Sequence, residues 1–311
     1  MNVSKAIISG ILIGLAAGGF YYLSVDKGSA EMPSYSVLTP LSDDPVITKD
    51  IEPEPVAPIS IISEKIGFEP LKASVSKRLG NYSLYIKDLD SGKTYEIDPE
   101  RNIYAASLYK IPVAVVTVKE IEKGNLAFDT EITYTSADSA GGSGVLNTEE
   151  IGTKYTIARL LSTLLKESDN VSQNMLLRTV SKTSIQEVFN AYLEGTKSQF
   201  SKDNISNAKE ISLFFENFYE SDYISGKNRE YLIDLMSSTS YDDRIADHLL
   251  PGVKFAHKIG SWGETGSWHD CGIVLGDDIE LVACLMSENT TYEDFMLTGK
   301  EVAGFINTLV E

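Results

Sequence analysis

The sequence is poor in the residue types that most often hold metal ions. Its 311 residues include two cysteines and three histidines, which are His248, His257 and His269. The histidines are scattered and form neither an H-x-H-x-D nor an H-E-x-x-H pattern, which argues against a metallo-hydrolase. We therefore expect no bound metal and no other cofactor.

Basic residues are also scarce. Lysine and arginine total 27 against 45 aspartates and glutamates, which gives a formal net charge of -18. Binding to nucleic acid needs a basic face, so this balance argues against a nucleic-acid partner. The hydrophobic fraction of 42% is ordinary for a globular protein, and the length allows one large domain or two of medium size. We expect a monomer.

Charge is almost absent from the start of the chain. Lys5 is followed by an uncharged run, AIISGILIGLAAGGFYYLSV, at residues 6–25, which is long enough to cross a bilayer as a helix. A cleaved signal peptide would have a shorter apolar core and a small-x-small cleavage site, which this segment matches only weakly. No cysteine that could carry a lipid lies near the end of the run. We interpret residues 1–25 as a transmembrane signal anchor with the rest of the protein outside the cytoplasm. Cleavage would give the same destination.

Residues 26–61 have a composition of their own. They are rich in proline and in acidic residues, as in DDPVITKDIEPEPVAP. This composition is typical of an extended tether with little structure. It would hold a folded domain, residues 62–311, away from the membrane.

Hydrophobic periodicity gives the order of elements in this domain. NYSLYIKDLD and KTYEIDP alternate apolar and polar residues around an SG turn and predict a hairpin at residues 81–99. Helical patterns follow at residues 107–124, 155–167, 171–180, 184–193, 207–220 and 228–238. Strand patterns at residues 253–260, 269–276 and 280–288 precede a final helix, TGKEVAGFINTLVE. Strands at both ends with helices between them predict an α/β fold of the α+β sandwich kind, in which a helical region is inserted into a mixed antiparallel sheet.

The two cysteines lie on neighbouring predicted strands. Cys271 is in CGIVLG and Cys284 is in IELVACLM, on either side of a GDD sequence. If Asp277 and Asp278 form the turn, the two cysteines are directly opposite each other in a hairpin. A cross-strand disulfide is then possible but geometrically demanding. We favour the alternative of two small, buried thiols.

A serine and a lysine lie one helical turn apart in AASLYKIPV, at residues 105–113. Residues i and i+3 share a face of a helix, so Ser107 and Lys110 would point the same way, as a nucleophile and its base must. Serine is a poor nucleophile at neutral pH without such a base. Alone, this pair is more often a simple helix start, so the rest of the chain has to decide.

Two further motifs follow in order. KESDNVSQN contains Ser168 and Asn170 at a junction between two predicted helices. HKIGSWGE contains Lys258 and Gly260 at the end of an apolar strand. Ser168 follows Ser107 by 61 residues, and Lys258 follows Ser168 by 90. The order S-x-x-K, S-D-N, K-T-G is the signature of class A β-lactamases and penicillin-binding proteins.

On these motifs the chain resembles the class A β-lactamases and their penicillin-recognising relatives. The resemblance covers roughly residues 62–311, and it includes the nucleophile helix and the approach to S-D-N at residues 142–177. It implies the family's fold and a serine acyl-enzyme that opens the amide of β-lactams. Ser107 would be the nucleophile and Lys110 its base, with a pKa lowered by burial and by the second cation, Lys258.

The resemblance implies roles for the rest of the site as well. Ser168 would pass a proton to the leaving nitrogen, and Lys258 would attract a carboxylate of the substrate. Asn170 would hold an amide of the substrate. The backbone N–H groups of Ser107 and Ser261 would form the oxyanion hole, whose donors are worth ~3 kcal/mol each in the transition state.

Two positions near the third motif depart from, or vary within, the family pattern. Ile259 stands where the family has threonine, which removes a hydroxyl that would help to bind the carboxylate. Arg244, 14 residues before Lys258, stands where some members carry a compensating arginine. The alternative is a surface charge paired with Asp242 or Asp243. The substrate-binding residues that we predict are Asn170, Gly260, Ser261 and Arg244.

A further departure concerns deacylation. Class A β-lactamases clear the acyl-enzyme with a glutamate in an E-x-x-L-N pattern between S-D-N and K-T-G, and this glutamate positions the hydrolytic water. None of the candidates is followed by x-x-L-N, and these are Glu187, Glu194, Glu210 and Glu216. The loop that would carry the glutamate is shortened to EGTKSQFSKDNIS. We therefore predict intact acylation chemistry without the usual deacylating group.

Three functions remain open at this stage. The sequence favours a serine hydrolase of the class A β-lactamase type. A D,D-peptidase-like penicillin-binding enzyme that acts on peptidoglycan peptides needs the same acylation chemistry and is the first alternative. A non-catalytic cell-wall-binding module is the second, although a pure binder has no need of a nucleophile and a base. A membrane anchor on the outer face suits both enzymes.

Overall fold

The computed structural model describes residues 64–196 and 198–311. The signal anchor and the tether, predicted at residues 1–25 and 26–61, lie outside these ranges and stay predictions. Within the two described ranges, no helix combines the length and the apolar character needed to cross a membrane.

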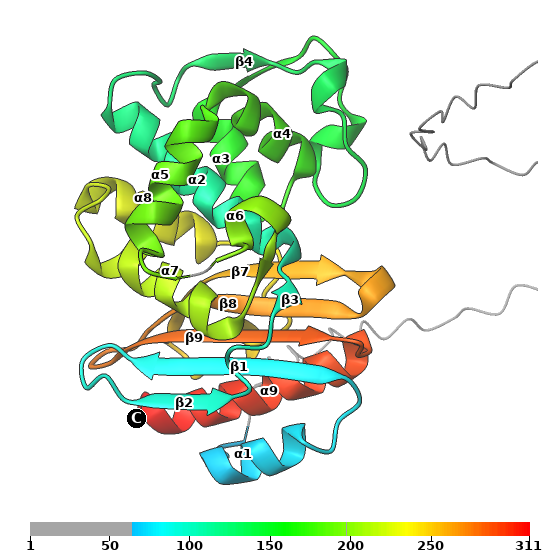
Figure 1. Ribbon diagram of the computed structural model, residues 1–311, viewed down its shortest axis with the longest axis vertical. Coiled ribbons are helices and arrows are strands. Elements are labelled where there is room, and N and C mark those ends of the chain that lie inside the picture. The colour runs from blue at the N-terminus through cyan, green and yellow to red at the C-terminus, as the bar shows by residue number, and fades with distance from the viewer. Residues whose placement is uncertain (1–63, 197) are drawn as a thin grey trace, which may run out of the picture. The chain divides into compact units, whose positions relative to one another are not determined.

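One antiparallel sheet forms the centre of the domain. Its strands are β1 (Asn81–Asp88), β2 (Thr94–Ile97), β7 (Lys254–Trp262), β8 (Ser267–Leu275) and β9 (Glu280–Glu288). From edge to edge they run β2-β1-β9-β8-β7. β1 pairs with β9 along its whole length, so strands from both ends of the domain meet as the sequence predicts (Figure 1). β7 is an edge strand, and β8 is its neighbour in the sheet.

Helices cover both faces of this sheet. They are α1 (Phe68–Val75), α2 (Lys110–Glu122), α3 (Ile157–Lys166), α4 (Asn170–Thr179), α5 (Lys182–Tyr192), α6 (Phe200–Asp203), α7 (Ala208–Glu220), α8 (Gly226–Met236) and α9 (Tyr292–Leu309). In Figure 1, α1 and α9 lie on one side of the sheet and the inserted helices on the other. Two hydrophobic clusters result. One joins the sheet to α1 and α9, and the other joins it to the inserted helices.

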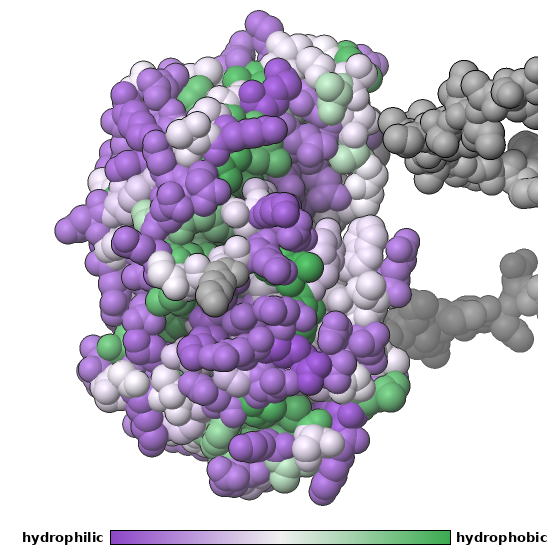
Figure 2. Space-filling view, in the orientation of Figure 1, coloured by the Kyte–Doolittle hydropathy of each residue, from purple (hydrophilic) through white to green (hydrophobic). Residues whose placement is uncertain are grey.

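α3 shows how the inserted helices bury their apolar side chains. The buried apolar residues recur at helical spacing and are Ile157, Leu160, Leu161, Leu164 and Leu165. Thr156 caps the helix by accepting a hydrogen bond from the backbone N–H of Arg159. Each buried leucine or isoleucine contributes about 1.5–3 kcal/mol through the hydrophobic effect. On the face of the molecule in Figure 2, hydrophilic residues predominate and apolar residues form scattered patches.

Several short elements were not predicted from the sequence. Two pairs of short strands form small sheets, and these are β3 (Ile103–Tyr104) with β6 (Ile205–Ser206) and β4 (Glu131–Thr133) with β5 (Lys154–Thr156). Strands of two or three residues show too little alternation to be recognised. α1 was also missed, and α9 begins six residues earlier than predicted because Thr291 caps it by accepting from the backbone N–H of Asp294.

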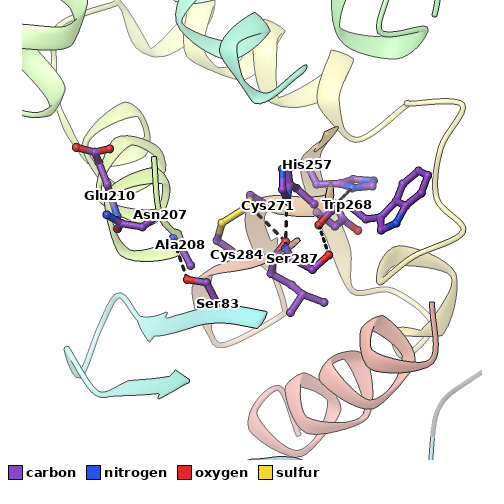
Figure 3. The surroundings of a disulfide bond; sticks show 12 residues. Ser83, Asn207, Ala208, Glu210, His257, Trp268, Cys271, Cys284 and Ser287 are labelled. Carbon is purple, nitrogen blue, oxygen red and sulfur yellow. Dashed lines mark hydrogen bonds and ion pairs between the residues drawn. A yellow bond between two sulfur atoms is a disulfide. The ribbon is translucent and has the colours of Figure 1, made fainter. Parts of the chain in front are cut away.

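Cys271 and Cys284 are joined by a disulfide bond (Figure 3). The predicted register is confirmed, since the two residues are directly opposite each other on β8 and β9. The expectation of two free thiols is wrong. Directly paired residues of neighbouring strands point to the same face of the sheet, so the ladder already brings the two sulfur atoms together. Both cysteines are buried in the cluster under the inserted helices.

Candidate active site

Ser107 lies in a 3₁₀ turn, η1 (Ala106–Tyr109), directly before α2. The sequence predicted a helix from Ser107 onward, whereas the α-helix begins at Lys110. Ala106 has a φ of 49°, a left-handed conformation that is unfavourable for alanine. Such backbone strain persists only where the surroundings fix the conformation, and it is frequent at active sites. Most of α2 is buried, so the turn has a rigid support.

β7 approaches this turn closely. A Cβ atom at Gly260 would lie 2.9 Å from the carbonyl oxygen of Ala105 and 2.6 Å from the His269 ring. Glycine therefore allows the strand to lie against the serine-bearing segment. Nε2 of His269 is 2.8 Å from the carbonyl oxygen of Tyr104. Burial lowers the pKa of His269 to about 4, so its ring is neutral and donates this hydrogen bond from Nε2.

Lys110 connects the serine to the S-D-N motif. Its Nζ is 3.2 Å from Ser107 Oγ, 3.1 Å from Ser168 Oγ and 2.7 Å from Asn170 Oδ1. It also donates to the carbonyl oxygen of Ser168. Burial lowers the pKa of Lys110 to about 7, although the carboxylate of Asp169 acts in the opposite direction. A substantial fraction of Lys110 is therefore neutral near pH 7 and can accept a proton.

Asp169 organises the backbone around the S-D-N motif. It is fully buried and caps α4, since its Oδ1 accepts from the backbone N–H of Ser172 at 2.6 Å. Its Oδ2 accepts from the backbone N–H groups of Val145 and Leu146 at 2.7 and 2.8 Å. Gly144 has a φ of 120°, and a Cβ there would overlap the Asp169 carboxylate. The glycine-rich segment GGSG, at residues 141–144, therefore wraps around Asp169.

The same segment fixes Ser168 and Asn170. Ser143 Oγ donates to the carbonyl oxygen of Ser168 at 2.9 Å. Asn170 Nδ2 donates to the carbonyl oxygen of Gly141 at 2.8 Å, while its Oδ1 accepts from Lys110. The amide of Asn170 is thus held in one orientation, with one N–H of Nδ2 left for a further acceptor.

Lys258 reaches Ser168 from β7. Its Nζ is 2.9 Å from Ser168 Oγ and 3.0 Å from the carbonyl oxygen of Ile259. Burial holds the pKa of Lys258 well below its usual range, and the positive charges of Lys110 and Arg244 act in the same direction. The hydroxyl of Ser168 therefore lies between two lysines, and the four side chains predicted to be catalytic are in one hydrogen-bonded chain.

Arg244 is almost completely buried, with 3% of its surface exposed. The alternative of a surface charge paired with Asp242 or Asp243 is therefore wrong. Nη1 of Arg244 donates to the carbonyl oxygen of Gly260 at 2.9 Å, and Nη2 donates to Ser261 Oγ at 2.7 Å. The guanidinium thus lies beside the end of β7, next to Gly260 and Ser261, which were also predicted to bind substrate.

A cavity of about 420 Å³ opens in front of these side chains. Its lining residues are Ser107, Ser143, Ser168, Tyr241, Arg244, Ile259, Ser261, Trp268 and Tyr292. Ser143, Tyr241 and Tyr292 were not predicted from the sequence. Ser143 belongs to the glycine-rich approach to S-D-N and Tyr241 precedes Arg244 by three residues, so their nearness to recognised positions was a usable signal. Tyr292 gave none, because it comes from the start of α9.

Carboxylates are missing from the described lining of this cavity. Glu187 and Glu216 form ion pairs with lysines elsewhere. Glu210 accepts a hydrogen bond from the hydroxyl of Ser206, and Glu194 is exposed. Across the described ranges, no three histidine, cysteine or carboxylate side chains are grouped so that they could hold a metal ion.

The segment between α5 and α7 stands where the family carries the deacylating glutamate. It also contacts the serine turn. Phe200 is buried, with its ring centroid 5.8 Å from that of Tyr109 and 5.4 Å from that of Phe189. Asn204 Nδ2 donates to the carbonyl oxygen of Ala106 at 2.9 Å. The segment therefore meets the turn with an aromatic ring and an amide rather than with a carboxylate.

The fold is that of the β-lactamases and penicillin-binding proteins. A solved β-lactamase from Sphaerobacter thermophilus has a TM-score of 0.71 and 20% identity, and the match covers 78% of this chain and 97% of that one. The structure of PBP-A gives a TM-score of 0.68 at 20% identity, and the match covers 79% of this chain and 99% of that one. At these identities the likeness establishes the fold.

The sequence establishes the family. The model of the β-lactamase enzyme family matches residues 68–309, and the chain belongs to this family. β-Lactamase VEB-1 of Pseudomonas aeruginosa is 27% identical over 188 residues, which are 55% of this chain and 63% of VEB-1. The match thus spans less than two thirds of that relative. The resemblance to class A β-lactamases and their penicillin-recognising relatives, inferred from three short motifs, is confirmed.

Proposed function

We propose that this protein is a serine acyl-enzyme hydrolase of the class A β-lactamase type, in which Ser107 attacks the amide of a β-lactam. One observation carries the proposal: Lys110 Nζ is 3.2 Å from Ser107 Oγ, in surroundings that lower the pKa of Lys110 to about 7. A base with this pKa is partly unprotonated near neutrality and can activate a hydroxyl. Membership of the β-lactamase family supports hydrolysis of β-lactams.

Acylation then proceeds in three proton transfers. Lys110 accepts the proton of Ser107 as Oγ bonds to the carbonyl carbon, and the backbone N–H groups of Ser107 and Ser261 stabilise the negative charge on the carbonyl oxygen. Because β7 is an edge strand, alternate N–H groups on it face away from β8 and toward a substrate. Ser168 gives its proton to the nitrogen as the C–N bond breaks, and it regains one from Lys110, 3.1 Å away.

Cationic side chains bind the carboxylate of the substrate. Lys258 and Arg244 supply the charge, and Ser261 Oγ lies 2.7 Å from Arg244 Nη2. Arg244 compensates for the hydroxyl that Ile259 lacks, because its guanidinium is always charged and Nη2 keeps one N–H besides the one donated to Ser261 Oγ. Asn170 binds the substrate's amide oxygen through the second N–H of its Nδ2.

A second candidate is a D,D-peptidase-like penicillin-binding enzyme that acts on peptidoglycan peptides. The described lining of the cavity offers no carboxylate to position a hydrolytic water, which favours a long-lived acyl-enzyme. A variant of PBP-A, a protein with the same fold, is described as an acyl-enzyme complex with penicillin G. Both candidates use the same acylation step and differ in how fast the ester is cleared.

The proposal extends to the location of the protein. The uncharged run at residues 6–25 supports a membrane anchor, and the proline-rich residues 26–61 support a tether. The catalytic domain would then act outside the cytoplasm, at the cell surface or in the periplasm. Peptidoglycan peptides are present there, and β-lactams arrive there first.

The deciding experiment incubates the full-length protein with a chromogenic cephalosporin and follows both the coloured product and the intact mass. Continuous product without a lasting adduct would identify a β-lactamase that deacylates without the usual glutamate. One equivalent of product, with the acyl group of the drug left on Ser107, would identify the penicillin-binding alternative. Neither product nor adduct would favour a non-catalytic wall-binding module. Adduct formation that survives the Ser107→Ala substitution would refute the proposed nucleophile.

A further inference from the structure

A second network of charged groups is buried behind the cavity, on the face of β7 that points away from Ser168. His257 precedes Lys258 on this strand, so the two side chains point to opposite faces of the sheet. His257 is fully buried, with Nδ1 2.6 Å from Asp270 Oδ1 and Nε2 3.2 Å from Asp242 Oδ1. It lies on the strand next to that of Cys271 (Figure 3). None of these groups takes part in the acylation steps described above.

One carboxylate of this network binds the loop at residues 241–248, and the other belongs to that loop. Asp270 Oδ2 accepts from the backbone N–H of Ile245 at 3.2 Å. Asp242 belongs to the loop, and its carbonyl oxygen accepts from the backbone N–H of Asp247 at 3.0 Å. His257 therefore ties one end of the loop to β7, and Asp270 ties its middle to β8. Arg244 lies between these two attachment points.

The imidazole suits a position between two carboxylates. Burial alone would lower the pKa of His257, but the carboxylates of Asp270 and Asp242 outweigh burial and raise it to about 9. The ring is therefore an imidazolium at neutral pH and donates from both nitrogens. The ring of Phe255 stacks on it at 4.5 Å between centroids. These contacts hold the ring in one orientation.

Arg244 depends on this loop for its place in the cavity wall. Its guanidinium donates to two backbone carbonyl oxygens and to Ser261 Oγ. It also lies over the rings of Tyr292 and Phe295, at 5.7 and 5.5 Å from their centroids. The three oxygen atoms that accept its hydrogen bonds are uncharged, so the positive charge of the guanidinium is available to an anion in the cavity. A guanidinium binds a carboxylate well only when both partners are correctly oriented.

We propose that His257 and Asp270 are positioning residues, which hold the loop at residues 241–248 so that Arg244 presents its guanidinium to the carboxylate of the substrate. This role rests on the proposed function, because it concerns the same site. It assigns the two residues to substrate selection rather than to proton transfer. Substrates that carry a carboxylate should depend on the pair, and matched substrates without that charge should not.

The test compares acylation of the full-length protein by penicillin G and by its methyl ester, which lacks the negative charge. The readout is the ratio of the two second-order rate constants. We expect His257→Gln to lower this ratio about tenfold, as for a weakened hydrogen bond to a charged group, and to leave the rate with the ester within twofold. Arg244→Ala should lower the ratio at least as much. The double variant should match Arg244→Ala alone, because both changes remove the same interaction.

Lys254→Gln is the matched control on the same strand. Its ion pair with Asp234 is 2.9 Å long and exposed, so the ratio should not change. If His257→Gln does not fold, Asp242→Asn removes the outer, half-exposed partner and should lower the ratio about threefold. An equal fall of both rates, or an unchanged ratio in the variant that folds, would overturn the positioning role. If neither compound acylates the wild-type protein, the proposed function itself fails, and the positioning role fails with it.

Discussion

The serine turn is contacted on two sides, and the two sides differ in the number of ionisable side chains that they bring to it. On one side, Lys110, Ser168 and Lys258 form a continuous chain with Ser107, with donor–acceptor distances of 2.9–3.2 Å. On the other side, the segment between α5 and α7 meets the turn with Phe200 and an amide. The first side is built from ionisable groups, and the second is built mainly for packing.

This difference separates two tasks that one active site is often assumed to perform together. Forming the acyl-enzyme needs a base for the serine, and we propose that this base is Lys110, because desolvation disfavours its charged form. Clearing the acyl-enzyme needs a base that can activate water. Lys110, with Nζ 3.2 Å from Ser107 Oγ, is placed to be the first base, whereas the described lining of the cavity lacks a carboxylate for the second. Under the proposed function, acylation would therefore occur without rapid hydrolysis.

The largest expected effect comes from removing the proposed base, Lys110, on the first side. Lys110→Gln should lower the acylation rate by ~10³-fold at pH 7, which is the range for removal of a general base. The wild-type rate should rise as the pH increases through about 7, because Lys110 becomes an effective base only when it loses its proton. The variant should lose this rise. Stopped-flow acylation between pH 5 and 9 measures both.

Lys123→Gln provides the control for that profile. Lys123 follows the same helix and pairs with the buried Glu120 and the exposed Glu187, and it makes no contact with Ser107 in these pairs, so its removal should leave the pH dependence unchanged. If Lys110→Gln kept the rise near pH 7, another group would have to be the base, and the contrast between the two sides would lose its foundation.

The next effect concerns the disulfide bond, which lies near the start of α7, on the second side of the serine turn. Ala208, at the start of α7, donates to Ser83 Oγ at 3.3 Å beside the disulfide (Figure 3). The cysteines are 13 residues apart, and a loop of this size predicts ~3 kcal/mol of stability from the cross-link. The double substitution Cys271→Ala and Cys284→Ala should lower the free energy of unfolding by about this amount and leave acylation within twofold. Denaturant unfolding and acylation rates measure the two quantities.

Wild-type protein with and without reductant serves as the comparison, since reduction should reproduce the loss without a change of sequence. A tenfold loss of acylation with full stability would show that the cross-link acts on the serine turn. The two sides would then not be separable.

The sequence predicts the first side, with Lys110, Ser168 and Lys258, much better than the second side, which is the segment between α5 and α7. S-x-x-K, S-D-N and K-x-G are local patterns that can be recognised in the sequence, and the structure brings their side chains together. Alternation in the last two strands also predicts that Cys271 and Cys284 face each other, since counting outward from a tight turn fixes the register. The order of strands and helices also predicts a sheet with a helical region inserted into it.

Contacts between distant parts of the chain cannot be predicted from local sequence patterns. The partnership of His257 with Asp242 and Asp270 depends on a loop that folds back over β7. The place of Tyr292 in the cavity depends on how α9 packs. The sequence does not predict the disulfide, because it gives the register of the two cysteines but not their final geometry.

A smaller effect should follow from restoring the family's hydroxyl. Ile259 is mostly buried, at 7% exposure, and lines the cavity next to Ser261. Ile259→Thr should raise the acylation rate about threefold with a carboxylate-bearing β-lactam, because one neutral hydrogen bond adds little where Arg244 already binds the anion. Ile259→Val is the control that changes shape without adding a hydroxyl. A loss of activity in the threonine variant would show that the apolar side chain is required there.

The smallest expected effect tests the second side directly. Glu187 pairs with Lys123 at 2.9 Å on the surface, and Glu194 is exposed. Exposed ion pairs contribute at most about 1 kcal/mol to stability, and neither side chain lines the cavity. Glu187→Gln and Glu194→Gln should therefore leave the lifetime of the acyl-enzyme within twofold of the wild-type value, measured by intact mass after excess drug is removed. A lifetime ten times longer in either variant would identify that glutamate as a group that activates water. The segment between α5 and α7 would then move during the reaction, and the contrast between the two sides would describe only the unliganded protein.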